Sequence, residues 1–211
     1  TPMMTINDKL RSRNIERWHT VATSIKQNIA EHSHCMGIIA EYLLEAIFAS
    51  TERQPSITER YIILKYAQVH DLPEIVTGDI SSPFKRFLKE MLPDFAPLME
   101  KVEASLTPEL AQLDKMMEQE QCGYLKIILK AADMLEAYSY FITCKGQDEK
   151  HNETVFNKLE TYIAECVDKG ARLYPEFDWM VINTVFSEIK EQSSSVVIDF
   201  ESELHAILKS G

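Results

Sequence analysis

The stretch YIILKYAQVHDLPE, residues 61–74, decides the fold class of this 211-residue chain. Its apolar side chains recur every three or four residues, which is the period of an α-helix with one buried face. His70 and Asp71 then stand side by side, although adjacent residues cannot share one face of a regular helix. Pro73 follows and favours a turn. The stretch therefore predicts a helix that ends where an imidazole and a carboxylate come together.

The same helical period covers most of the chain, which has only six glycines and eight prolines to interrupt it. We therefore predict an all-α bundle of roughly eight to ten helices. The candidate helices are residues 5–15, 30–49, 56–70, 82–91, 95–104, 107–119, 123–143, 149–172, 176–191 and 199–209. Ser56 and Glu59 are expected to cap the helix that starts at 56. The serines at 193–195 are expected to form a short linker before the last helix.

The composition narrows the class of protein. With 45% hydrophobic and 26% charged residues the chain is typical of a globular protein, and we assign residues 1–211 to one domain. The net charge of −11 would repel polymeric nucleic acid. We expect no membrane partner, because no apolar run approaches the roughly 20 residues of a membrane span and no signal peptide opens the chain. The four cysteines form no C-x-x-C pair, so we expect a reducing cytoplasm and no disulfide framework.

A second histidine and a second carboxylate are suited to share a site with His70 and Asp71. His32 stands at the start of one apolar helix and Asp133 within another. Burying an unpaired carboxylate is costly, and a metal ion is one compensation. The four donors suit a divalent transition metal (Mn²⁺, Co²⁺, Fe²⁺, Ni²⁺ or Zn²⁺) without selecting among these ions. The other histidines, at 19, 34, 151 and 205, have no partner pattern and are expected to face solvent or fill space.

The order His, then His-Asp, then a distant Asp resembles the HD-domain phosphohydrolases. A larger set of matching positions, spread over residues 13–140, is similar to the bacterial 5′-deoxynucleotidase branch of that family. These positions are Arg17-Trp18, Asn28, Glu31-His32-Ser33, His70-Asp71-x-x-Glu74-x-x-Thr77-Gly78-Asp79, Pro83-x-Lys85 and Lys130-x-Ala132-Asp133-x-Leu135-x-Ala137-Tyr138. The resemblance implies an HD-type helical domain, to which residues 149–211 add helices but no motif.

The resemblance also implies a role for each matching polar residue. The metal ligands would be His32, His70, Asp71 and Asp133. Glu74 would position or deprotonate the attacking water, and Asp79 would orient Arg17 toward phosphate. Trp18 would lie against the sugar or base and exclude a 2′-hydroxyl, and Lys85 would meet phosphate as a point charge. This assignment is chemically coherent, because a bound cation lowers the pKa of water and a nearby carboxylate can take the proton during in-line attack.

The resemblance leaves two 2′-deoxynucleotide substrates open, both cleaved between the 5′ oxygen and the α-phosphorus. Residues 17–32 look more like the phage dATP triphosphohydrolases than like the enteric 5′-monophosphatases, where the position of Ala22 is often basic. We therefore lean toward a deoxynucleoside triphosphate of the dATP type, which leaves room for an additional Mg²⁺, and keep the 5′-monophosphate as the alternative. Candidate contacts for the outer phosphates are Lys26, Arg86 and Lys89.

Two functions of other classes fit parts of the same pattern. A catalytically silent HD module would bind a nucleotide for regulation, but it would not need Glu74. A helical oxygenase would use similar donors, but it normally needs further histidine or carboxylate ligands for a second iron. By analogy with the family, we expect a homo-oligomer, a dimer or larger, in the cytoplasm of a bacterium or of a phage-infected host.

Overall fold

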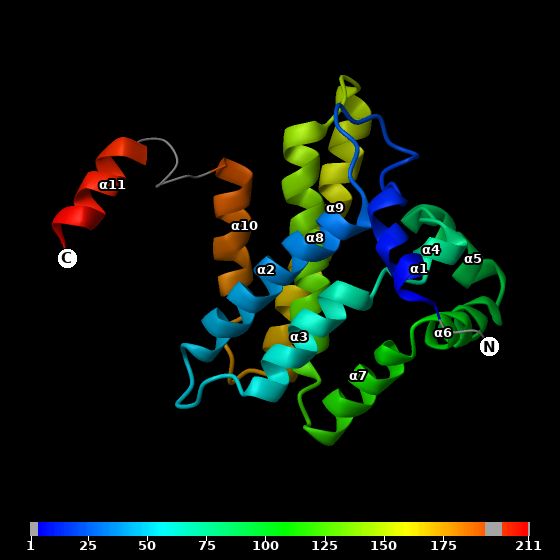
Figure 1. The fold of residues 1–211 in the computed structure, drawn as a ribbon, viewed down its shortest axis with the longest axis horizontal. Helices are drawn as coiled ribbons and strands as arrows, with labels where there is room; N and C mark the ends of the chain where they lie inside the picture. Colours follow the sequence, from blue (N-terminus) through cyan, green and yellow to red (C-terminus); the bar gives the residue numbers. More distant parts are fainter. Residues whose placement is uncertain (1–3, 193–199, 211) are drawn as a thin grey trace.

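The structure, a computed structural model, describes residues 4–192 and 200–210. Over this part it confirms the all-α prediction, because every regular element is a helix and extended backbone forms only isolated bridges. In chain order the α-helices (Figure 1) are α1 Ile6–Leu10, α2 Ile29–Phe48, α3 Ile57–Val69, α4 Glu74–Thr77, α5 Ser82–Met91, α6 Phe95–Leu106, α7 Pro108–Gln119, α8 Tyr124–Cys144, α9 Glu149–Leu173, α10 Val181–Glu191 and α11 Phe200–Lys209.

Three elements differ from the predicted boundaries. The helix expected at 5–15 divides into α1 and a 3₁₀ turn, Arg11–Asn14. The helix expected at 176–191 begins only at Val181, because turns occupy the residues before it. The short α4 was not predicted, since a single turn is too short to show a helical period. The predicted serine linker at 193–195 and residue 199 lie outside the described residues.

The core forms where α2, α3 and α8 pack against one another, and α9 and α10 also pack against α8 (Figure 1). Leu43 of α2, Ile62 of α3 and Leu125 of α8 are fully buried in one contiguous apolar cluster. Packing on this scale fixes the relative positions of the three helices, because protein interiors are packed as densely as organic crystals. Any polar side chains that these helices direct at one another are therefore held in place.

Capping boxes set where α2 and α3 begin. The Asn28 side chain accepts the backbone N–H of Glu31 at 2.9 Å, and the Glu31 carboxylate accepts the backbone N–H of Asn28 at 3.3 Å. This arrangement puts His32 in the first turn of α2, where its side chain is completely buried. Ser56 and Glu59 form the same motif at the start of α3, as the sequence predicts.

The contact between α9 and the turn before α10 depends on Gly170. The ring of Trp179 lies over this glycine so closely that a Cβ atom there would stand 2.2 Å from ring atom Cδ2. Trp179 is almost fully buried, and its Nε1 donates to the carbonyl of Tyr174 at 2.8 Å. The absence of a side chain at Gly170 thus lets the indole of Trp179 pack directly against α9.

The last helix differs from the rest of the molecule. In Figure 1, α11 stands apart from the bundle, and every one of its residues is exposed. Its sequence is nevertheless amphipathic, with Phe200, Leu204 and Ile207 among the exposed apolar side chains. None of the described helices, α11 included, is both long enough and apolar enough to cross a membrane.

Candidate active site

Three helical segments bring two histidines and two carboxylates to one point. His32 comes from the first turn of α2, His70 caps the C-terminus of α3 with Asp71 next to it, and Asp133 comes from the middle of α8. Asp133 Oδ1 lies 3.1 Å from His32 Nε2, and Asp71 Oδ2 lies 3.7 Å from the same nitrogen. Asp71 Oδ2 is also 3.2 Å from His70 Nε2. The four residues that the sequence nominates thus lie around one point, with Asp133 placed against His32. Asp133 stands outside the group of His32, His70 and Asp71, whose ligand atoms all lie within 4.8 Å of one another.

The hydrogen bonds of the two imidazoles leave their Nε2 atoms free for a metal ion. His70 Nδ1 donates to the carbonyl oxygen of Ala67 at 2.9 Å, and His32 Nδ1 bonds to the carboxylate of Glu136. Both Nε2 atoms are buried without a hydrogen bond of good geometry. His32, His70 and Asp71 each offer one ligand atom, and these three atoms all lie within 4.8 Å of one another. Two imidazole nitrogens and two carboxylates form the donor set that a divalent transition metal prefers, so the residues fit such an ion.

Charge interactions tie the histidines of this site to its carboxylates. Burial lowers the pKa of His70, but the Asp71 and Asp133 carboxylates outweigh burial and raise it to about 9. Burial raises the pKa of Asp71, but His70 outweighs this and lowers it to about 2. The pKa of Asp133 is also depressed against the effect of burial, chiefly by His32. The carboxylates are therefore ionised at neutral pH, as metal ligands must be, whereas His70 holds a proton that a metal ion would have to displace.

Glu74 stands in the first turn of α4, one turn beyond the His-Asp pair. Its Oε2 atom is buried and has no hydrogen-bond partner. Burial first, and then the negative charges of Asp71 and Asp79, raise the pKa of Glu74 to about 8. A half-buried carboxyl group with an unused oxygen beside a candidate metal centre is suited to exchange a proton with a bound molecule.

Arg17 and Trp18 lie in the segment before α2 and share one partner. Arg17 Nη1 and Trp18 Nε1 donate to Gln27 Oε1 at 3.0 and 3.1 Å. Trp18 stacks on Phe141 with ring centroids 5.3 Å apart and an interplanar angle of 10°. Its backbone φ of 64° is unusual for a bulky residue, and such strain is often found at functional sites.

Asp79 follows Gly78, whose φ of 74° turns the chain after α4. The predicted orientation of Arg17 by Asp79 is not what the structure shows, because the hydrogen bonds of Arg17 run to Gln27 and Glu136. Asp79 instead places Oδ2 3.6 Å from Nδ1 of His19, a histidine for which the sequence suggests no partner. Asp79 still contributes to raising the pKa of Arg17, so its charge acts on the site without direct contact.

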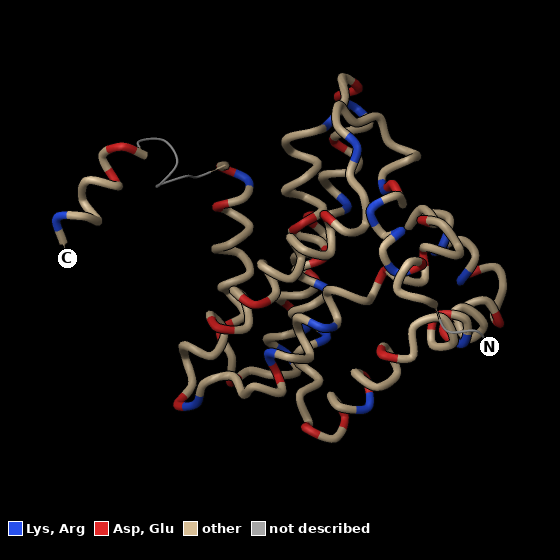
Figure 2. The backbone as a smooth tube through the Cα atoms, in the orientation of Figure 1, with Lys and Arg blue, Asp and Glu red and all other residues tan. Residues whose placement is uncertain are grey.

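A cleft of about 450 Å³ opens beside these residues, with Arg17, Trp18 and Asp79 in its wall. Figure 2 shows basic and acidic residues distributed over the whole bundle. The cleft departs from that mixture, because Asp79 is the only carboxylate among its lining residues whereas its cations are Arg17, Lys85, Arg86, Lys89, Lys130 and Lys158. Lys26, nominated from the sequence, lines a different cavity. Lys158 was missed, because it lies on α9, far in sequence from the other cations. Lys130 belongs to the motif resemblance, which gave it no phosphate contact.

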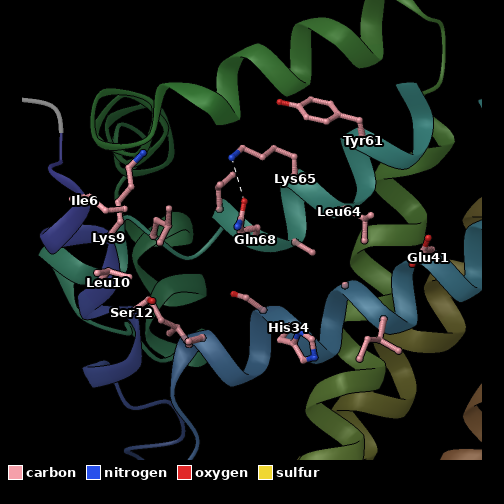
Figure 3. A pocket seen from close by; sticks show the side chains of 18 residues that line it. Ile6, Lys9, Leu10, Ser12, His34, Glu41, Tyr61, Leu64, Lys65 and Gln68 are labelled. Carbon is pink, nitrogen blue, oxygen red and sulfur yellow. Dashed lines mark hydrogen bonds between the residues drawn. The ribbon is translucent and has the colours of Figure 1, made fainter. Parts of the chain in front are cut away.

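A larger cavity of about 1000 Å³ lies elsewhere, between α1 and the α2–α3 pair (Figure 3). Ile6, Leu10, Tyr61 and Leu64 give it a largely apolar wall, and a hydrogen bond of 3.2 Å joins Lys65 Nζ to Gln68 at its edge. None of the four candidate metal ligands lines it. None of them lines the cationic cleft either, but that cleft has Arg17, Trp18 and Lys85 in its wall, so the residues expected to bind substrate lie there and not at the larger cavity.

Comparison with known proteins finds relatives that match most of the chain. A dATP triphosphohydrolase of Acinetobacter phage SH-Ab 15497 is 27% identical over 203 residues, which cover 93% of this chain and 96% of that protein. A 5′-deoxynucleotidase of Pasteurella multocida is 31% identical over 137 residues, covering 61% of this chain and 67% of the relative.

The fold has a counterpart among solved structures. The Cyanophage S-2L HD phosphohydrolase DatZ, bound to dA and one catalytic Zn²⁺ ion, superposes with a TM-score of 0.66 at 23% identity, covering 91% of this chain and 98% of that one. The family model for YfbR-like 5′-deoxynucleotidases matches residues 6–187. As the motif resemblance predicts, the chain belongs to the YfbR-like 5′-deoxynucleotidase family.

Proposed function

We propose that this protein hydrolyses the 5′ phosphate of 2′-deoxynucleotides with one divalent metal ion held by His32, His70, Asp71 and Asp133. The observation that carries the proposal is the convergence of these side chains with two buried imidazole nitrogens that lack hydrogen bonds. When bound, such an ion would lower the pKa of a water molecule and neutralise charge on the phosphoryl oxygens. The protein residues described next would supply the remaining parts of the reaction.

Glu74 is proposed as the general base. The free Glu74 oxygen would accept a proton from water as the water oxygen attacks the α-phosphorus. The bond from phosphorus to the sugar 5′ oxygen would break in line with the attack, and this oxygen would take a proton from solvent to leave as the hydroxyl of the deoxynucleoside. A pKa raised to about 8 by burial and by Asp71 makes Glu74 a stronger base than an exposed glutamate. A module that only binds nucleotides would not need such a group.

Arg17, Trp18 and Lys85 are proposed to bind the substrate. The guanidinium of Arg17 is a planar fork of donors that suits phosphate, and Lys85 lines the same cleft. The Trp18 ring, fixed by its stack on Phe141, offers a rigid wall for the sugar or base. Asp79, which lies near His19, is proposed to act on Arg17 only through its charge.

Between the two substrates, the cleft favours a deoxynucleoside triphosphate. A single phosphate would need few cations, whereas the cleft presents six Lys and Arg side chains in a protein of net charge −11. Relatives named dATP triphosphohydrolases also support this choice. The products would be deoxynucleoside and triphosphate. The alternative, release of phosphate from a deoxynucleoside monophosphate, is supported by the relatives named 5′-deoxynucleotidases.

The decisive experiment identifies the phosphate species that is released. The protein loaded with Zn²⁺, Co²⁺, Mn²⁺, Fe²⁺ or Ni²⁺ would be incubated with ribo- and deoxynucleoside mono- and triphosphates, with and without added Mg²⁺. Intact triphosphate released from dATP supports the main proposal, and orthophosphate released from dAMP supports the alternative. Stoichiometric nucleotide binding without any product would instead support a silent binding module.

Two further parts of the proposal concern the whole protein. We propose that it self-associates as a dimer or larger assembly, which the exposed apolar residues of α11 and the apolar cavity of Figure 3 support. Sedimentation of the metal-loaded protein would test this.

We also propose a cytoplasmic location, because the four cysteines are unpaired, as expected in a reducing compartment.

A further inference from the structure

Glu136 is a buried carboxylate that no motif in the sequence singles out. It is 3% exposed and lies on α8 one turn beyond Asp133, so both side chains project from the same helix face. A buried carboxylate is costly unless donors surround it. Glu136 has three donors: Nδ1 of His32, Nε2 of Gln27 at 2.5 Å, and Nη1 of Arg17 at 3.4 Å. All three belong to segments at the candidate active site.

Gln27 is the second buried polar residue of this network, at 4% exposed. Its Oε1 faces two groups that can only donate, the Arg17 guanidinium and the Trp18 indole. The amide orientation is thereby determined, and Nε2 must point at Glu136. The backbone carbonyl of Gln27 also accepts the N–H of Arg17 at 2.8 Å. Gln27 therefore touches both proposed substrate-binding residues and the partner of a proposed metal ligand.

Each end of this network has a chemical consequence. The Glu136 carboxylate fixes His32 with its proton on Nδ1, so the Nε2 lone pair faces the metal position, and a carboxylate partner makes an imidazole a stronger ligand. At the other end, the backbone of Trp18 has a φ of 64°, which a bulky side chain adopts only when its surroundings enforce it. The Gln27 hydrogen bond and the ring stack on Phe141 supply that enforcement.

We infer that Glu136 and Gln27 are positioning residues that tie the metal ligand His32 to the nucleotide-binding pair Arg17 and Trp18, an inference that rests on the proposed function of the site. Glu136 strengthens metal binding through its charge on His32. Gln27 holds Trp18 and Arg17 at a set distance from the metal ligand His32. Neither residue needs to touch the reacting atoms.

The test exchanges the amide and the carboxylate. Glu136→Gln keeps an oxygen for His32 but removes the charge and sets an amide N–H₂ against that of Gln27. Gln27→Glu sets two carboxylates against each other. In the double variant, Gln27→Glu with Glu136→Gln, every donor again faces an acceptor. The carboxylate charge, however, now stands beside Arg17 and no longer beside His32. Zn²⁺ affinity would be measured against a competing chelator, and deoxyadenosine affinity by calorimetry on the zinc-loaded proteins.

We expect Glu136→Gln to lose about 10–100-fold in Zn²⁺ affinity, the usual effect of removing such a partner. The double variant should regain thermal stability and deoxyadenosine affinity but keep the weakened Zn²⁺ affinity, a separation that a merely structural role would not produce. Glu160→Gln serves as the matched control, because Glu160 pairs with Tyr138 and Lys190 away from the site.

Two results would overturn the inference. Wild-type Zn²⁺ affinity in Glu136→Gln would show that Glu136 does not strengthen metal binding. If the double variant bound deoxyadenosine as weakly as Gln27→Glu does, Gln27 would not position Trp18 and Arg17. These binding measurements need no turnover. If the protein hydrolysed no nucleotide, the proposed function would be refuted, but the Zn²⁺ affinities would still test the role of Glu136.

Discussion

Side chains that meet across long sequence separations set the chemistry of this protein. The pattern of His32, His70, Asp71 and Asp133 could be recognised from the sequence, because each residue carries a local motif. Gln27 and Glu136 could not be recognised, because their role arises only where residues 109 positions apart form a hydrogen bond. Glu136 nevertheless left one signal: a charged residue on an apolar helix, three positions after Asp133.

Replacing Glu74 by glutamine tests the general base. The amide is the same size but cannot accept the proton from water, so we expect kcat to fall about 10²–10⁴-fold. Zn²⁺ affinity should change little, because His32, His70, Asp71 and Asp133 are intact. Turnover by Glu74→Gln at the wild-type rate would contradict the mechanism. Glu90→Gln, on the exposed part of α5, is the control and should retain full activity.

Replacing Trp18 tests the exclusion of the 2′-hydroxyl. Trp18→Ala removes the aromatic wall, so we expect the preference for dATP over ATP, measured as the ratio of their kcat/KM values, to fall about 10–100-fold. Trp18→Phe can keep a stack on Phe141 and should retain more of the preference. An unchanged ratio in Trp18→Ala would show that another group discriminates between the sugars.

At the scale of helices, the sequence is informative wherever periodicity and caps coincide. The capping box of Ser56 and Glu59 marks the start of α3 in both sequence and structure. By contrast, α4 is a single turn, and the break between α1 and the 3₁₀ turn leaves the apolar period intact. Such features depend on how the chain packs around the site, which a single-sequence pattern does not record.

Glu59 makes the start of α3 sensitive to acid. Burial raises the pKa of Glu59, but bonds from Arg53 at 2.9 and 3.0 Å and from the N–H of Ser56 lower it overall. A lowered pKa means that the stabilisation is present above the unfolded value near 4.5 and is lost as the pH falls through the folded value.

We therefore expect Glu59→Gln to destabilise the protein by about 1 kcal/mol at pH 7, since Arg53 is partly exposed. The difference from wild type should shrink below pH 4.5. Thermal unfolding from pH 7 to pH 3 would measure it, with the exposed Glu52→Gln as control. A difference that grew at low pH would have the wrong sign and would refute this account.

Gly170 tests the packing of α9 on Trp179. A methyl group at this position would meet the indole at 2.2 Å, so Gly170→Ala should cost about 1–3 kcal/mol by overpacking. Gly37→Ala is the matched control, because its Cβ would meet Ala67 at an ordinary 3.6 Å. Calorimetry should show a lower Tm for Gly170→Ala only, and equal Tm values for the two variants would contradict the packing argument.

The charge of the whole molecule and the charge of its cleft have opposite signs. The net charge of −11 was visible in the sequence, but the concentration of six cations around one cleft required α5, α8 and α9 to be placed in space. The assignment of residues 1–211 to one domain stays a prediction. Within the described residues, one apolar cluster extends from Met36 in α2 to Val185 in α10.

Because every residue of α11 is exposed, the bundle should not depend on it. At a concentration where both proteins sediment as monomers, a chain that ends after Gln192 is expected to unfold within about 2 °C of the full-length protein. Differential scanning calorimetry would measure this, and sedimentation would show whether α11 contributes to self-association. A Tm lowered by 10 °C or more in the monomeric protein would contradict this, because α11 would then have to pack against the bundle.

The placement of the two tryptophans provides an optical signal. Trp179 is sealed under α9, whereas Trp18 is in the wall of the cationic cleft, stacked on Phe141. Emission from the sealed indole should stay constant when a nucleotide arrives, while emission from the cleft indole should be quenched by a stacked base. The Trp179→Phe variant would leave Trp18 as the single tryptophan of the chain, so that ligand arrival could be followed by tryptophan emission in a stopped-flow instrument without any attached dye.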